Sequence, residues 1–87
     1  MYHMYLLKSE KDGRLYVGYT SDLERRLKAH NAGFVTYTRK YLPWVLSYYE
    51  SFLSLEDAKK REKALKHFGG AYKHLKVRIM NSLKGAG

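Results

Sequence analysis

The chain has no cysteine, a single proline, few acidic residues and no long apolar run. Without cysteine there is no disulfide, no thiolate metal site and no cysteine nucleophile, and nothing calls for an oxidising compartment. The apolar runs are far shorter than the roughly 20 residues that span a bilayer, and the N-terminus lacks the pattern of a signal peptide. We therefore expect a cytoplasmic protein that is neither secreted nor inserted into a membrane.

The remaining composition is that of one folded domain. The chain has 87 residues, of which 45% are hydrophobic and 29% charged, close to the averages for packed globular proteins. No repeat or low-complexity segment interrupts it, and it ends in Lys84-Gly85-Ala86-Gly87. We expect a single domain over residues 1–83 and a flexible tail over residues 84–87.

Positive charge is in excess and unevenly distributed. The 17 Lys and Arg residues against 8 Asp and Glu residues leave a formal net charge of +9. No acid follows Glu62, whereas six basic residues do: Lys63, Lys66, Lys73, Lys76, Arg78 and Lys84. This pattern favours a polyanionic partner such as nucleic acid, with improved solubility as the alternative explanation.

The first half of the chain predicts a hairpin followed by a helix. Residues 2–8 and 15–19 are rich in aromatic and branched side chains, and Asp12-Gly13 between them is typical of a hairpin turn. Both faces of each strand are apolar, so helices should cover at least part of both faces of the sheet. Ser21, with Glu24 three residues later, forms a capping-box pattern and predicts a helix over residues 22–31.

The second half predicts one more strand and two more helices. Residues 33–42 show no clear period and indicate an exposed basic loop, and residues 44–52 return to strand composition. A helix beginning after Ser54 ends at Phe68-Gly69-Gly70, and residues 71–83 predict a last helix. The order β-β-α-β-α-α indicates an α+β class, an α/β sandwich with a central three-stranded antiparallel sheet flanked by helices.

Glu62 occupies an unusual position on the second predicted helix. It falls on the same stripe as Leu55, Ala58 and Leu65. An ionised carboxylate facing a core needs a charged partner or a metal ion. The alternative is an ordinary ion pair with Lys66 one helical turn later, solvated at the edge of the stripe.

Two further pairs of residues are compatible with either a functional or a purely structural role. Arg26 and His30 lie one turn apart on one helix face, where a guanidinium suits a phosphoryl group and an imidazole exchanges a proton near neutral pH. They can equally be the polar side of an amphipathic helix. Tyr5 and Tyr16 lie on the two hairpin strands, either opposite each other or diagonally related, and can face one pocket or simply pack.

The order of these features resembles a known family. The chain carries His3-Met4-Tyr5, then Leu15-Tyr16-Val17-Gly18-Tyr19-Thr20, then the run from Ser21 to His30, and finally Arg61-Glu62-Lys63-Ala64-Leu65-Lys66. Over residues 2–75 this is similar to the GIY-YIG endonuclease superfamily, in particular to its small stand-alone bacterial branch. Relatives of that branch include the N-terminal nuclease domain of the excision-repair protein UvrC, homing endonucleases and structure-specific nucleases.

The resemblance implies five catalytic side chains and one metal ligand. Tyr16 would be the general base, Tyr5 its partner phenol, Arg26 the phosphate-binding arginine, His30 the active-site histidine and Glu62 the single metal-binding carboxylate. A phenol is a poor base at neutral pH, so Tyr16 would need the positive field of Arg26 and the metal, or a relay through His30. One Mg²⁺ or Mn²⁺ ion is implied, because a single hard carboxylate suits these ions better than zinc.

The implied activity is metal-dependent hydrolysis of DNA phosphodiester bonds, in repair or on branched or single-stranded DNA, with RNA not excluded. Basic residues would hold the phosphate backbone without reading sequence: Arg39, Lys40, Lys59, Lys63 and Lys66. Two alternatives stay open: a catalytically weak or inactive nucleic-acid-binding module of the same fold, and a basic scaffold for an acidic protein. The short chain is also compatible with a homodimer or an unknown protein partner.

Overall fold

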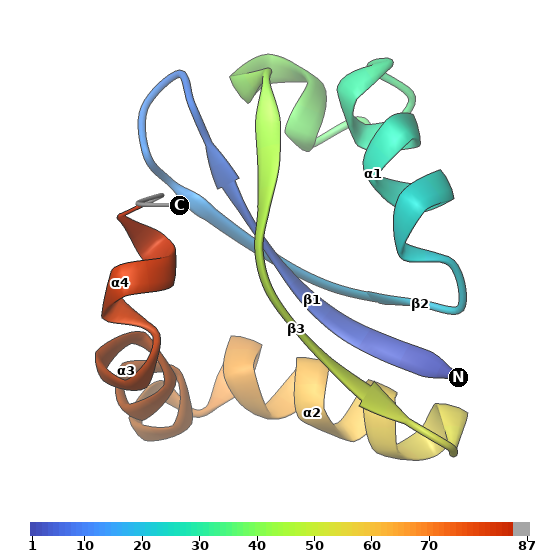
Figure 1. Cartoon of the computed structure of the whole chain (residues 1–87), viewed down its shortest axis with the longest axis vertical. Helices are drawn as coiled ribbons and strands as arrows, with labels where there is room; N and C mark the ends of the chain where they lie inside the picture. Colours follow the sequence, from blue (N-terminus) through green and yellow to red (C-terminus); the bar gives the residue numbers. More distant parts are fainter. Residues whose placement is uncertain (85–87) are drawn as a thin grey trace.

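The computed structural model describes residues 1–84, in which a three-stranded antiparallel sheet carries helices on both faces (Figure 1). The elements are β1 (Tyr2–Ser9), β2 (Leu15–Thr20), α1 (Leu23–Asn31), the 3-10 helix η1 (Thr38–Tyr41), β3 (Trp44–Phe52), α2 (Leu55–His67), α3 (Gly69–Arg78) and α4 (Met80–Leu83). The strand order β2-β1-β3 makes β1 central and β2 an edge strand. The predicted α+β class and the order of the elements are confirmed, except that the last helix is divided in two.

The hairpin forms at the predicted turn. Gly13 has a φ of 80°, a left-handed conformation that glycine adopts without strain. The turn sets a register in which Leu7 pairs with Tyr16 and Tyr5 with Gly18. Because side chains alternate along a strand, Tyr5, Leu7 and Tyr16 share one face of the sheet.

Each face of the sheet has its own core. On one face, Tyr5, Leu7 and Trp44 are buried and pack with side chains from α1 and η1, among them Leu27 and Tyr41. On the other face lie Met4, Leu6, Val17, Leu65, Leu75 and Ile79, in contact with α2, α3 and α4. Figure 1 shows the same division, with α1 on one side of the strands and α2 to α4 on the other. The prediction that helices cover both faces is confirmed.

Asp22, not Ser21, caps the first helix. Its carboxylate accepts a hydrogen bond from the Arg25 backbone N–H at 3.1 Å, and α1 therefore begins at Leu23. A carboxylate at this position both satisfies a free N–H group and interacts favourably with the helix dipole. The predicted capping box is wrong by one residue, although the helix ends at Asn31 as expected.

The segment over residues 33–42 is more ordered than a plain exposed loop. Residues 38–41 form η1, and Thr38 is completely buried. The Trp44 indole N–H donates to the Thr38 carbonyl at 2.7 Å, which ties this segment to the start of β3. Arg39 and Lys40 nevertheless remain exposed, as predicted.

The last predicted helix is two helices with a bend at Ile79. α3 begins at Gly69, earlier than predicted, because the extended Phe68 ends α2 and starts α3 directly. The backbone of Ile79 leaves helical geometry, with φ −112° and ψ 26°, and the bend keeps Leu83 packed against the core that contains Ile79. Of the predicted tail, Lys84 closes α4, and residues 85–87 lie outside the described residues. Within residues 1–84 no helix combines the length and apolar character needed to cross a bilayer.

Candidate active site

Tyr5 and Tyr16 lie diagonally across the hairpin. Tyr16 pairs with Leu7, two residues from Tyr5 along β1, so both phenols project from the same face. Their ring centroids are 6.4 Å apart. The diagonal arrangement is one of the two that the hairpin turn allowed.

Gly18 makes room for the Tyr5 ring. A Cβ atom built on Gly18 would overlap the Tyr5 hydroxyl and ring at distances that real Cβ atoms do not show. The Tyr5 side chain therefore lies directly over the Gly18 backbone, against the edge strand. The glycine of the Tyr16-Val17-Gly18 motif is required by this close approach.

Helix α1 brings Arg26 and His30 to the Tyr5 hydroxyl. The Arg26 Nε–H donates to the Tyr5 oxygen at 3.4 Å, and His30 Nε2 lies 2.9 Å from the same oxygen. Residues four apart on a helix share a face, which is why both side chains reach one atom. The hydrogen bond to Tyr5 raises the pKa of Arg26, and Tyr16 contributes in the same direction. The guanidinium thus faces both phenols.

A buried chain of hydrogen bonds continues behind Tyr5. His30 Nδ1 lies 2.8 Å from Thr38 Oγ1, which in turn lies 3.4 Å from the Val35 carbonyl. In the tautomer protonated at Nδ1, His30 donates to Thr38, Thr38 donates to Val35, and the Tyr5 hydroxyl donates to Nε2. Arg26 then donates to the free lone pair of the Tyr5 oxygen. This arrangement gives every group in the chain a partner.

Burial sets the protonation states of this chain. Desolvation, followed by the charge of Arg26, lowers the pKa of His30 from 6.5 to about 4. Burial also raises the pKa of Tyr5, opposed by its hydrogen bond from Arg26. Both groups are therefore neutral at pH 7. The proton exchange near neutral pH that we expected of His30 does not fit its buried position, whereas a role in holding Tyr5 does.

Glu62 reaches the site from the opposite face of the sheet. It lies on α2, and its half-buried side chain, 17% exposed, forms an ion pair with Lys66 at 3.0 Å. Its charge contributes to the raised pKa of Tyr5, so the carboxylate lies within electrostatic range of that phenol. Lys66 is thus the charged partner of the Glu62 carboxylate. This is the ion pair that we gave as the alternative to a metal ion.

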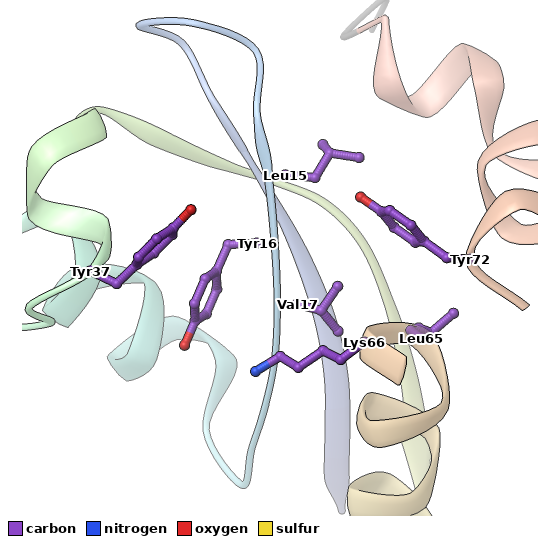
Figure 2. A pocket seen from close by; sticks show the side chains of 7 residues that line it. All are labelled: Leu15, Tyr16, Val17, Tyr37, Leu65, Lys66 and Tyr72. Carbon is purple, nitrogen blue, oxygen red and sulfur yellow. The ribbon is translucent and has the colours of Figure 1, made fainter. Parts of the chain in front are cut away.

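Lys66 crosses the edge strand toward the phenols. Its ammonium lies 5.4 Å from the centre of the Tyr16 ring, and Figure 2 shows the side chain running from α2 past β2 toward Tyr16. Lys66 thus lies close to Tyr16 while its side chain stays 39% exposed, and its predicted contact with the DNA backbone stays a prediction. The candidate site therefore lies at the edge strand β2, with Tyr16 and Arg26 on the α1 face and Lys66 approaching from α2.

The donor atoms fit a hard divalent ion held by one protein ligand. Within residues 1–84 no group of three His, Cys, Asp or Glu side chains is close enough to enclose a metal. Mg²⁺ does not need such a group, because it keeps several waters and binds through one or two carboxylates and substrate phosphate oxygens. Glu62 fits this requirement, although an ion there must compete with the Lys66 ammonium.

The other predicted nucleic-acid-binding residues lie on exposed surfaces. Arg39 and Lys40 belong to η1, and Lys59 and Lys63 to α2. Lys59 sits over the ring of Tyr19, 6.0 Å from its centre, on the edge strand. Lys59 thus lies against the edge strand that also carries Tyr16.

Sequence reasoning missed three residues that shape the site. Thr38 completes the buried chain of hydrogen bonds, and Tyr37 stacks on Tyr16 with ring centroids 6.0 Å apart. Tyr72, on α3, lines a pocket that Tyr16 and Tyr37 also line (Figure 2). Tyr37 and Thr38 lie in a segment without hydrophobic periodicity. An aromatic residue close to basic residues, as Tyr37 is, was the one feature that could have indicated a binding role. Tyr72 depends on how α3 turns back toward β2, which the predicted break at Phe68-Gly69-Gly70 does not specify.

A family model for the GIY-YIG catalytic domain matches residues 1–77 of this chain. The chain belongs to the GIY-YIG family. The matched range contains both tyrosines, the α1 pair and Glu62, and the roles that the resemblance implies for them stay predictions. The resemblance drawn from the ordered motifs is thereby confirmed.

Individual GIY-YIG relatives carry the description UPF0213 protein. One from Halobacterium salinarum is 42% identical over 74 residues, covering 84% of this chain and 95% of the relative. One from Bacillus pumilus is 38% identical over 86 residues, covering 98% of this chain and 87% of the relative. The solution NMR structure of a UPF0213 protein from Bacillus halodurans, 36% identical, superposes with a TM-score of 0.55 over 91% of this chain and 85% of that one.

Proposed function

We propose that this GIY-YIG protein is a metal-dependent endonuclease that hydrolyses phosphodiester bonds in DNA, in repair or in the processing of branched or single-stranded DNA. One observation supports the proposal: Arg26 of α1 donates to the Tyr5 hydroxyl beside Tyr16, and the half-buried carboxylate of Glu62 pairs with Lys66, whose ammonium lies 5.4 Å from the centre of the Tyr16 ring. A basic protein with such a group is suited to bind and cleave a polyanion.

In this proposal the chain's residues divide the work of an in-line attack on phosphorus. Tyr16 takes a proton from the attacking water, aided by the positive field of Arg26. Arg26 neutralises charge that builds on the non-bridging oxygens. His30 and Thr38 hold Tyr5, and through it Arg26, in place. A divalent ion held by Glu62 would supply Lewis-acid stabilisation of the leaving oxygen.

Basic side chains around the site would hold the DNA backbone. Arg39, Lys40, Lys59 and Lys63 are exposed, so phosphates can reach their charged groups. Such contacts position a strand without reading bases, so cleavage should show little sequence preference and binding should weaken steeply with salt. RNA would satisfy the same contacts.

One observation favours the inactive binding module as a second candidate. Within residues 1–84, Glu62 is the one carboxylate that we place at the site, and its ion pair with Lys66 already neutralises it. If the ammonium cannot be displaced, the basic surface still binds nucleic acid but no ion is held. The two candidates agree on binding and differ in Mg²⁺-dependent cleavage.

The test is nicking of a labelled branched DNA in the presence of Mg²⁺. Arg26→Ala should lower the rate roughly 100-fold or more, the usual effect of losing a preorganised donor to the transition state. Arg25→Ala, which removes an exposed neighbour on the same helix, is the matched control and should retain the rate. Equal rates for the two variants would exclude the catalytic role of Arg26.

A further inference from the structure

A pocket of about 370 Å³ lies directly beside the candidate active site (Figure 2). Its size is at the lower end of the range of roughly 300–1,000 Å³ for small-ligand sites. Three of its seven lining residues are tyrosines, three are aliphatic and one is basic: Tyr16, Tyr37, Tyr72, Leu15, Val17, Leu65 and Lys66. Tyr16 and Lys66 belong to both the pocket and the site, so an occupant would lie next to the scissile bond.

The pocket wraps around the edge strand β2. Tyr16 and Tyr37 bound it on the α1 face, where their rings are stacked at an interplanar angle of 28°. Tyr72 bounds it from the opposite face, as Figure 2 shows, with Leu15 and Val17 on the strand between them. The result is an apolar recess with aromatic walls on both sides of a strand.

The register of the hairpin gives this recess polar groups as well. The Ser9 N–H donates to the Arg14 carbonyl, so bonded pairs recur at every second residue and include Leu7 with Tyr16. The N–H and C=O groups of Leu15 and Val17, in the alternate positions, therefore point away from β1 at the sheet edge. A planar ligand in the pocket would meet a backbone donor and acceptor in addition to aromatic rings.

These features match a nucleobase that is not paired with another base. A base offers flat faces for tyrosine and an edge of donors and acceptors for the backbone, and stacking on aromatic side chains accepts every base. The strand that carries it is an anion, and Lys66 supplies a positive charge between the pocket and the reaction centre. A base in a duplex has both its faces and its edge occupied and cannot enter.

We propose that this pocket holds one unpaired nucleobase next to the scissile phosphate, so that the substrate is a single strand or a flap and not continuous duplex. The inference rests on the proposed nuclease function, which it narrows to a substrate class. It assigns Tyr37 and Tyr72 as specificity-determining residues that contact the base and take no part in the chemistry.

Binding of matched oligonucleotides tests the pocket without cleavage. Oligothymidine and an abasic oligonucleotide of the same length carry the same phosphates, and only the first carries bases. In the presence of EDTA, the full chain should bind oligothymidine about 5- to 100-fold more tightly, the range expected for stacking of a base on an aromatic ring. Equal affinity for the two oligonucleotides would overturn the proposal.

Side-chain variants then locate the effect. Tyr37→Ala, at an exposed position, and Tyr72→Ala should abolish the preference for oligothymidine, and Tyr72→Phe should restore it because the ring is kept. Tyr49→Ala, which removes an exposed tyrosine of β3 outside the pocket, is the matched control. Loss of preference in Tyr49→Ala to the same degree, or none in Tyr37→Ala, would contradict the pocket. Self-association of the chain through β2 would also contradict the proposal if oligothymidine does not disrupt it. A second copy would then cover the recess.

The two proposals fail in different ways. If the chain prefers oligothymidine through Tyr37 and Tyr72 but never nicks DNA, the pocket stands and the nuclease function fails. If it nicks DNA with the same affinity for abasic and natural strands, the nuclease function stands and the pocket fails.

Discussion

His30 is fully buried and uses both ring nitrogens in hydrogen bonds, to Tyr5 and to Thr38. A protonated imidazole would lose its acceptor nitrogen and be buried as a cation close to Arg26, which is why its pKa falls to about 4. The residue is thus suited to fix the orientation of Tyr5 and not to carry protons at neutral pH. This function leaves a signature in the pH dependence of stability.

We expect the free energy of unfolding to decrease as the pH falls from about 6.5 to about 4. The folded-state pKa of His30 is depressed, so between these values the unfolded state binds a proton that the folded state does not. The slope within this window approaches about 1.4 kcal/mol per pH unit for one such group. Urea unfolding at several pH values measures it, and His30→Gln should remove most of the slope. A slope unchanged in that variant would assign the effect to other groups.

Gly18 and Gly70 provide a second test at the scale of single residues. Gly18→Ala should destabilise the fold by about 1–3 kcal/mol, because the new methyl group overlaps the Tyr5 ring. Gly70→Ala, in a helix with open space around its Cβ position, should be stabilising by up to about 1 kcal/mol. Thermal unfolding of both variants checks the pair. Similar stability of the two would mean that Tyr5 does not lie over Gly18.

At the scale of elements, α2 connects the two faces of the sheet to the site. Arg61 donates to both carboxylate oxygens of Glu50 on β3, at 2.9 and 3.1 Å, and fixes the helix against the far edge. The next residue, Glu62, and Lys66 one turn later extend toward β2. The order of Arg61 and Glu62 in the motif thus has a geometric reason: one anchors the helix and the other reaches the site.

Removing the Lys66 ammonium should strengthen metal binding at Glu62. In Lys66→Gln the carboxylate loses its competing cation, and the affinity for Mn²⁺ should rise by up to about fivefold, the value of a typical exposed ion pair. Isothermal titration calorimetry measures the change, with Lys63→Gln on the exposed side of the same helix as the control. Unchanged or weaker binding in Lys66→Gln would show that the ion does not use Glu62.

Local patterns predicted the elements better than they predicted how the elements meet. Strand alternation and the Asp12-Gly13 turn were sufficient for the hairpin, and helical spacing for the convergence of Arg26 and His30. The position of Glu62 was not accessible in this way, because its approach to the phenols requires β2 to be an edge strand. The bend at Ile79 and the burial of Thr38 likewise result from tertiary packing, which no short segment encodes.

At the scale of the whole molecule, we expect the net charge to provide affinity for nucleic acid and the shape of the recess to provide selectivity. The net charge of +9 favours a polyanionic partner, whereas the candidate active site and the aromatic recess occupy one edge of the sheet. Affinity should therefore come mostly from phosphates and depend on salt, and the choice of strand from the recess.

The salt dependence of DNA binding measures the contribution of phosphate contacts to affinity. Lys59→Ala and Lys63→Ala should each reduce the slope of log K against log salt concentration by about 0.7–0.9, the value for one neutralised phosphate. Lys28→Ala should leave the slope unchanged, because Lys28 already pairs with Glu24 at 3.3 Å. Fluorescence anisotropy over a salt series checks this. Equal slopes for all variants would place the DNA elsewhere on the surface.

Mg²⁺-dependent nicking of branched DNA by Glu62→Gln, compared with Glu56→Gln at an exposed position of the same helix, tests the central claim most directly. If one carboxylate holds the ion beside the two phenols, Glu62→Gln loses roughly 100-fold or more of the wild-type rate and Glu56→Gln loses none. A wild-type rate in Glu62→Gln, or wild-type protein that nicks no more than buffer does, would contradict it.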